Sequence, residues 1–343
     1  MTDSKFLTHR YSKKLNFALA QANLKLNFLK CLDLKIYKQT LVLCLFLLST
    51  NISAQQIPQY SQWFWNMYSI NPAFVGLKQC LEIKTVYRNQ WSNLEGSPNS
   101  GFLTFSTPIY TLRKKEYTPR QGCGFKYETE KIGPFTMNRF NLSYAGHFNF
   151  TADTRLSLGL SAGFKQWVFD KQKVTTLVPD PIVNESNSYF SPDATFGAWW
   201  NGKNYFVSAS FHELIRSKWD NIGTTSRFKI HTFLSAGLRK SINNQFTLLP
   251  FVLVRIPPKG PLSMDLNLVL NYSNKIDFGV GFRNGDALTA LLQIKFRENF
   301  AIGYSFDYVI SKLGRDQFFS HEFGLTYGTC KGKATSQTIC PLF

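Results

Sequence analysis

The sequence predicts an all-β protein, a transmembrane antiparallel β-barrel of about 14 strands that follows a short N-terminal periplasmic segment. Three observations predict it: an export signal, alternating strands of membrane-spanning length, and connections that alternate between short and long. The aromatic content of 16% excludes a disordered chain. The absence of several apolar runs of roughly 20 residues excludes a polytopic helical membrane protein.

Residues 1–54 are predicted to be a secretory signal peptide with an over-long leader. The first 38 residues are basic, Leu41–Leu48 is an unbroken apolar run, and small residues lead to Ala54, after which we expect cleavage. A single membrane anchor is the alternative, but so short a run cannot cross about 30 Å of hydrocarbon as a helix. The long leader favours a misassigned start codon.

The remaining chain divides into a periplasmic segment at 55–79, an outer-membrane β-barrel at 80–329 and a periplasmic tail at 330–343. In the barrel region, large apolar residues alternate with polar or small ones, and no strong 3.6-residue period competes with this pattern. The predicted strands are 81–91, 100–108, 121–129, 139–150, 154–165, 193–201, 203–213, 227–241, 245–256, 262–272, 276–284, 286–297, 300–310 and 319–329. A secreted sandwich with one wet face is the alternative, but these strands exceed its usual length of about 5–6 residues.

Connection lengths supply the topology. Tight turns are expected after the strands that end near residues 150, 201, 241, 272 and 297, and long loops at 170–192, 213–226 and 311–318. Bacterial barrels have short periplasmic turns and longer outer loops, so both termini are expected in the periplasm. Two connections break the rule. The connection at 109–120 is long where a short turn is expected, and the connection at Gly285 is short where a long loop is expected. Fourteen strands suggest a narrow or plugged lumen.

No chemistry-bearing motif stands out. The histidines are scattered and the cysteines lack metal-ligand spacing, so we expect no catalytic residue, no cofactor and no metal. His147 with Ser143 or Ser157 could be read as an outer-wall hydrolase pair, but no nucleophile-elbow pattern accompanies it. The net charge of +18 is spread along the chain rather than clustered. An exported protein of this kind is expected to meet an anionic outer surface rather than nucleic acid.

The N-terminal part of the mature chain carries a set of ordered motifs. It begins with Tyr60-Ser61-Gln62, Asn66, Asn71-Pro72-Ala73-Phe74 and Gly76. The barrel region continues the set with Tyr87-Arg88-Asn89-Gln90-Trp91, Gly96-Ser97-Pro98, Lys131-Ile132-Gly133-Pro134, Gly260–Asp265, Arg283-Asn284-Gly285-Asp286-Ala287, Ile302–Tyr308 and His321-Glu322. Over the whole mature chain this set resembles the PorP/SprF family of type IX secretion system outer-membrane proteins. Trp63–Met67 is richer in Trp than the family pattern, and Val75 stands where a small residue is usual.

The resemblance implies a non-enzymatic outer-membrane barrel of a Bacteroidetes-type, Gram-negative bacterium. It implies a role in a secretion and gliding system, assisting export or surface attachment of secreted proteins such as large adhesins. The implied partners are type IX secretion components, exported proteins with a type IX C-terminal signal, and outer-membrane lipid. A passive channel or transporter for small solutes is the alternative function. The long loops at 170–192 and 213–226 are the expected surface for an exported partner.

The mature chain has an even number of cysteines, at positions 80, 123, 330 and 340, in an oxidising compartment. We favour a Cys330–Cys340 disulfide because the loop between them is short. A Cys80–Cys330 bond across the seam between the first and last strands is second, and free thiols are third.

Overall fold

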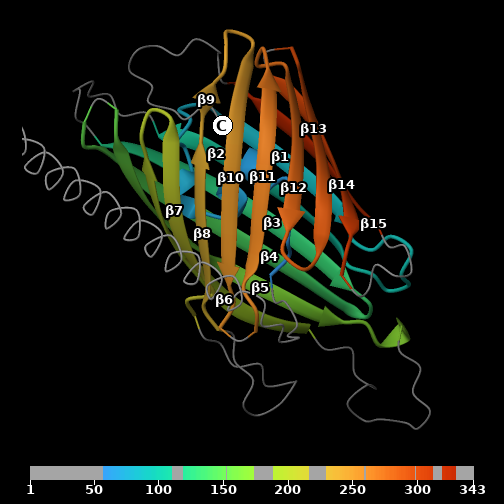
Figure 1. Cartoon of the computed structure of the whole chain (residues 1–343). Coiled ribbons are helices and arrows are strands. Elements are labelled where there is room, and N and C mark those ends of the chain that lie inside the picture. Colours follow the sequence, from blue (N-terminus) through green and yellow to red (C-terminus); the bar gives the residue numbers. More distant parts are fainter. Residues whose placement is uncertain are drawn as a thin grey trace, which may run out of the picture. The chain divides into compact units, whose positions relative to one another are not determined.

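The computed structural model describes residues 57–109, 119–151, 153–173, 188–215, 229–258, 260–297, 299–311 and 319–329. Within these residues the strands form one antiparallel sheet that closes on itself, because β10 pairs with β11 and β15 pairs with β1 (Figure 1). The result is a closed barrel of 14 strands, since β8 and the two-residue β9 both pair with β10 and act as one interrupted strand. The predicted fold class is confirmed.

The strands lie where the alternation predicts them, with bounds that differ by a few residues. They are β1 (Glu82–Asn89), β2 (Asn99–Ile109), β3 (Arg120–Ile132), β4 (Phe135–Asn149), β5 (Arg155–Phe169), β6 (Ser188–Asn201), β7 (Tyr205–His212), β8 (His231–Leu238), β9 (Lys240–Ser241), β10 (Phe246–Ile256), β11 (Ser263–Tyr272), β12 (Ile276–Arg283), β13 (Ala287–Phe296), β14 (Phe300–Val309) and β15 (Phe319–Gly328). The short 3-10 turns are η1 (Trp63–Trp65), η2 (Met67–Ser69), η3 (Pro72–Phe74) and η4 (Lys171–Lys173).

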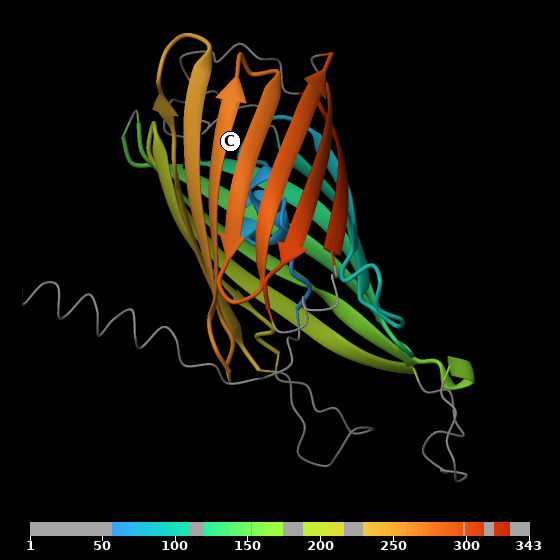
Figure 2. The ribbon, with the colours of Figure 1, turned by 45° about the vertical axis from the view of Figure 1, so that its right-hand side comes forward.

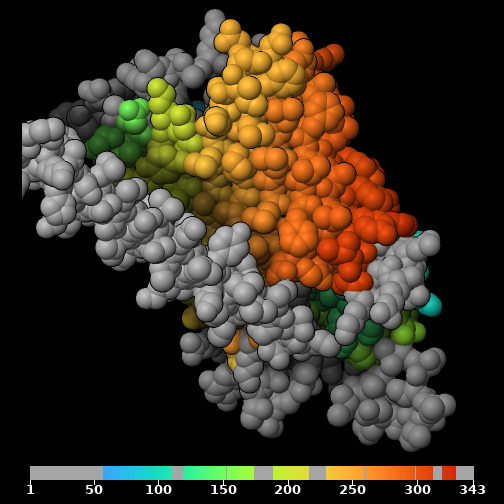
Figure 3. Space-filling view, in the orientation of Figure 1, coloured from blue at the N-terminus to red at the C-terminus, as the bar shows by residue number. Residues whose placement is uncertain are grey.

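Side chains alternate between the two faces of the barrel wall. Leu142 and Val280, for example, are 69% and 63% exposed on the outside. Charged side chains such as Arg88 and Glu322 point inward and are 1% and 0% exposed. The outer side chains of β10 to β14 form a continuous surface (Figure 3). An apolar outer belt around a polar interior is the pattern that a bilayer imposes on a barrel.

The two ends of the barrel differ. One end, the short-turn rim, carries the turns after β4, β6, β9, β11 and β13. The other end, the long-loop rim, is where β5, β7 and β14 finish and where the chain continues into 174–187, 216–228 and 312–318, which lie outside the described residues. The two exceptions noted in the sequence remain exceptions, because β2 is followed by a long connection at the short-turn rim and β12 by a short one at the long-loop rim.

The N-terminal segment Ile57–Gln79, here called the plug, lies inside the barrel (Figure 2). The sequence predicts a periplasmic segment at residues 55–79. Instead, the described part folds inside the barrel, where most of its residues are buried. The physical reason is that the lumen offers both an apolar patch for the aromatic side chains and polar groups for the irregular backbone, whose N–H and C=O groups must find partners when buried.

Candidate functional site

The plug is the candidate functional site, and its centre is the Asn71-Pro72-Ala73 turn. The Asn71 side chain accepts a hydrogen bond from the Ala73 backbone N–H at 2.9 Å, and Pro72 starts η3 with its φ angle already fixed. The Asn71 amide also donates to the carbonyls of Ala198 and Ala209, both at 3.1 Å. One side chain thus forms the turn and attaches it to strands β6 and β7.

The wall is built to let this turn approach. A side chain added at Gly197 would collide with Oδ1 of Asn71, and one added at Gly159 would collide with the backbone of Pro72 and Ala73. Glycine is therefore required at these two strand positions because backbone and plug touch there.

The backbone of the Tyr60-Ser61-Gln62 motif is bound by the carboxylate of Glu322. The backbone N–H groups of Ser61 and Gln62 donate to the two oxygens of Glu322 at 2.8 and 2.9 Å. The Gln62 amide donates to the Glu322 backbone carbonyl at 2.9 Å. Glu322 therefore holds both the backbone and a side chain of the motif, from a strand near the other end of the sequence.

A buried charge network, here called the β1 network, surrounds Ser61. Arg88 forms ion pairs with Asp307 at 2.6 Å and with Glu322 at 3.0 Å. Arg283 pairs with Asp265 at 3.0 Å. The Ser61 hydroxyl donates to Asp307 and accepts from both Arg88 at 2.8 Å and Arg283 at 3.1 Å. Buried charges need such partners, because an unpaired one is costly in a low-dielectric interior.

A second network, here called the β4 network, lies around Arg139. This guanidinium pairs with Glu128 at 2.9 Å and with Glu213 at 3.2 Å, and Lys165 pairs with Glu213 at 2.8 Å. Glu213 has a φ of 59°, which is unusual for a residue other than glycine. This conformation comes immediately after β7 and directs the carboxylate into the barrel. Lys126, which pairs with Glu128, connects the network to the plug by donating to the Ser69 carbonyl at 3.0 Å.

Two histidines also hold the plug backbone. Nε2 of His147 lies 2.9 Å from the Val75 carbonyl and Nδ1 lies 2.8 Å from the Ser157 hydroxyl. Because a carbonyl only accepts, Nε2 carries the proton and the Ser157 hydroxyl donates to Nδ1. His212 lies 2.9 Å from the Ile70 carbonyl in the same way. The geometry assigns His147, considered from the sequence as half of a hydrolase pair, to holding the plug.

The aromatic part of the plug packs on one side of the lumen, where the inner face is apolar. Phe74 contacts Trp199 with ring centroids 5.1 Å apart, and Trp199 stacks on Phe206 at 4.3 Å. Phe64 stacks on Phe251 at 4.9 Å. The polar-inside rule therefore fails on β6, β7 and β10, where the plug supplies the apolar partner.

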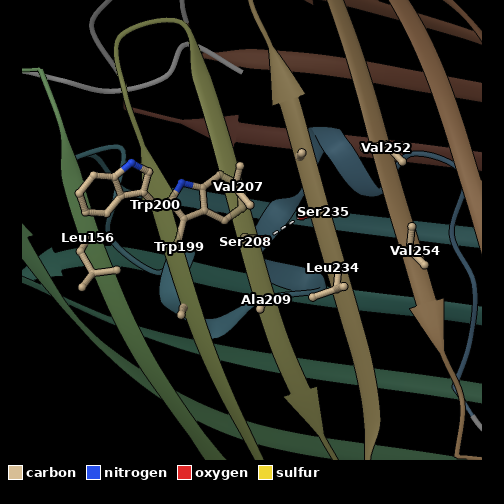
Figure 4. Close-up of a pocket in the computed structure, with 12 residues that line it drawn as sticks. Leu156, Trp199, Trp200, Val207, Ser208, Ala209, Leu234, Ser235, Val252 and Val254 are labelled. Carbon is tan, nitrogen blue, oxygen red and sulfur yellow. Dashed lines mark hydrogen bonds between the residues drawn. The ribbon is translucent and has the colours of Figure 1, made fainter. Parts of the chain in front are cut away.

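On the outer face of the same strands lies a shallow apolar groove of about 380 Å³. Small residues, among them Ala198, Ala209 and Ala236, lie between bulkier ones such as Trp200 and Leu234. Figure 4 shows how these side chains lie along neighbouring strands. The groove thus lies over the alanines, between larger outward side chains.

The motif residues predicted from the sequence separate into two groups. Those that belong to the plug or hold it are Tyr60, Ser61, Gln62, Asn71, Pro72, Ala73, Gly76 and Arg88. Those that build the long-loop rim are Gln90, Trp91, Gly96, Pro98, Gly133, Pro134, Gly285 and Asp286. Tyr87 belongs to neither group, since it faces outward and is half exposed.

The rim residues form turns that contact one another. Gly133 donates its backbone N–H to the Gly96 carbonyl at 3.0 Å, and both glycines have positive φ angles of 54° and 72°. Asp286 pairs with Arg283 at 3.2 Å, which joins the turn at Gly285 to the β1 network. The second group is therefore a connected rim.

Sequence reasoning missed most of the residues that hold the plug. Arg283, Asp307 and Glu322 lie inside motifs but were not recognised as a site, and Arg139 and Glu213 lie outside every motif. The sequence signal that could have found these residues is a charged side chain at an inward position of a strand. Such a side chain must find a partner inside the lumen.

The cysteines are only partly described. Cys80 is disulfide-bonded, and Cys123 is a free thiol. Cys330 and Cys340 lie outside the described residues, so the pairing expected between them stays a prediction. Within the described part of the chain no cluster of three or more His, Cys, Asp or Glu side chains could hold a metal ion. None of the helical segments described is long and apolar enough to cross a bilayer.

The family model described as "Type IX secretion system membrane protein PorP/SprF" matches residues 52–327. No curated protein matches the sequence. Among solved structures, the barrel is similar to a Pseudomonas aeruginosa FadL homologue, with 12% identity, a TM-score of 0.44, and coverage of 79% of this chain and 94% of that one. It is also similar to the Ralstonia pickettii toluene transporter TbuX, with 10% identity, a TM-score of 0.43, and coverage of 75% and 91%.

Proposed function

Since the chain belongs to the PorP/SprF family of type IX secretion system membrane proteins, we propose that it is a non-enzymatic outer-membrane component of that system. In this proposal it assists export or surface attachment of secreted proteins, large adhesins among them, in a Gram-negative bacterium of the Bacteroidetes type. Its partners are other secretion components and exported proteins with a type IX C-terminal signal.

One observation supports this function over passive transport of small solutes: the lumen is occupied by the plug. The plug is held by the β1 network, the β4 network, two histidines and an aromatic cluster. A passive pore needs a continuous polar path, and here the plug occupies the part of the lumen through which that path would run. A partner would therefore bind at the rims rather than pass through the barrel.

The long-loop rim is the proposed surface for the exported partner. It combines the connected rim turns with the loops at 170–192 and 213–226, and loops on a rigid scaffold are where binding residues concentrate. Residues 174–187 and 216–228 lie outside the described part of the structure.

Deletion of the whole protein, followed by comparison of the surface and medium proteomes, tests the proposal. Loss of one or a few proteins with a type IX C-terminal signal supports an adhesin-specific acceptor, and loss of all of them supports a core component. Unchanged proteomes would remove the secretion role and favour the channel. A matched variant lacking only 174–187 should lose partner display while the barrel remains inserted, as judged by heat-modifiable migration on gels.

A further inference from the structure

The plug has a direction, and it runs lengthwise through the barrel from the long-loop rim to the short-turn rim. Its first part contacts strand residues close to the long-loop rim. The Tyr60 ring lies 4.6 Å from that of Phe102, three residues into β2. Ser61 contacts Arg88, one residue before the end of β1, and Asp307, two residues before the end of β14.

The middle and last parts of the plug contact residues progressively nearer the other end. Asn66 donates to Thr104 at 3.0 Å. Gly76 then donates to Ser106 at 2.9 Å, near the end of β2, and the Val75 carbonyl accepts from His147, two residues before the end of β4. The chain then enters β1 at the short-turn rim.

The mature amino terminus therefore has little freedom to lie elsewhere. Cleavage after Ala54 would leave five residues before Tyr60, which span at most about 18 Å when fully extended. From Phe102 to the end of β2 at the short-turn rim there are seven residues, or about 23 Å. The rest of the plug occupies the lumen between those two levels. Because barrel strands tilt by about 35–45°, that distance is about 16–19 Å along the barrel axis, so only a fully extended segment running back past the plug would reach the short-turn rim.

We propose that the mature amino terminus lies at the long-loop rim and forms part of the surface on which the exported partner docks. The role of the terminus in binding the exported partner rests on the proposed function, whereas its position does not. The plug then becomes a covalent connection between a partner-facing end and the opposite rim. The last strand, β15, ends at Gly328 at the short-turn rim. The proposal therefore places the two ends of the mature chain at opposite rims, whereas the sequence predicts both in the periplasm.

Epitope insertion tests the position. The same tag is placed between Ala54 and Gln55, within 174–187, or in the Asn243-Asn244 turn at the short-turn rim. Antibody binding is compared in intact and permeabilised cells. We expect the first two tags to behave alike and the third to behave oppositely. If the amino-terminal tag instead behaves like the Asn243-Asn244 tag, the proposed position is wrong.

Two further readouts separate the clauses. Labelling of the terminal amine by a membrane-impermeant reagent, read by mass spectrometry of the first peptide, repeats the test without an insertion. An amine that is labelled only after permeabilisation, beside a 174–187 tag detected in intact cells, contradicts the proposed position. Loss of exported proteins from the surface of the amino-terminally tagged strain, with normal heat-modifiable migration, supports docking. Unchanged display removes the docking clause while leaving the position of the terminus intact. A pair of tags that is accessible only after permeabilisation would preserve the position but contradict outer-surface docking.

Discussion

Replacement of Glu322 by Gln should release the first part of the plug while leaving the barrel closed. The carboxylate accepts the backbone N–H groups of Ser61 and Gln62 and forms an ion pair with Arg88. A glutamine amide has one oxygen, so one of the two N–H groups would face an NH₂ group that cannot accept. The substitution also removes a negative charge that compensates Arg88, although Asp307 still pairs with that guanidinium.

The size of the effect follows from these contacts. A hydrogen bond to a charged group contributes about 1.5–3 kcal/mol, and breaking a buried ion pair costs about 3–5 kcal/mol. Taking about 3 kcal/mol for the combined loss, the open form of this segment should become roughly a hundredfold more populated, since each 1.4 kcal/mol is a factor of ten.

Amide hydrogen exchange of the purified barrel measures this directly at Ser61 and Gln62. Exchange of the peptide that contains them should accelerate by about two orders of magnitude, because exchange follows local opening. The matched control is Asp277→Asn, which alters a buried inward carboxylate that pairs with Lys295. Equal exchange at Ser61 and Gln62 in wild type and Glu322→Gln would refute the assignment of Glu322 as the holder of the motif.

Three other outcomes are expected. Gly197→Ala should displace the Asn71 turn, at a cost of about 1–3 kcal/mol for overpacking, and faster exchange in residues 70–75 would report it; unchanged exchange there would contradict the close approach. Glu213→Ala should lower the temperature at which the barrel loses its heat-modifiable migration, because it removes the buried carboxylate that Arg139 and Lys165 share, at a cost of about 3–5 kcal/mol; an unchanged midpoint would argue against the β4 network. Peptide mapping without reduction should find Cys80 oxidised and Cys123 alkylated; a Cys80 peptide joined to the Cys330 peptide would support the bond across the seam and exclude the Cys330–Cys340 pairing, whereas an alkylated Cys80 would contradict its disulfide.

The strands could be predicted because successive side chains of a barrel strand point alternately to the outside and to the lumen. This alternation leaves a period of two in the sequence. All 14 predicted stretches correspond to strands of the barrel, with β8 and β9 counted as one. The rule weakens on β10, where Leu249, Phe251 and Leu253 face inward although they are apolar. Their partners are aromatic residues of the plug, which the pattern of one strand cannot reveal.

The plug itself could not be placed from the sequence. Its short 3-10 turns leave no period, and its position depends on contacts with residues far away in the chain. Ser61 and Glu322 are 261 residues apart, and Arg88 and Asp307 are 219 apart. These pairs meet only when β1 and β15 close the barrel. The family motifs identified Ser61 and Arg88 as special residues, but not that they touch.

The enclosed plug has a consequence for the order of assembly. The plug is the first part of the mature body to be synthesised, yet its contacts include β14 and β15, which are the last strands. These contacts can form only when β14 and β15 are in place, so docking of the plug is completed together with the pairing of β1 with β15. The N-terminal segment would then be a template around which the strands gather, and a chain that lacks it would have to close without the plug residues that pack on the inward aromatic side chains of β6 and β10. Delivery of this protein to the membrane and closure of its lumen would thus be one event.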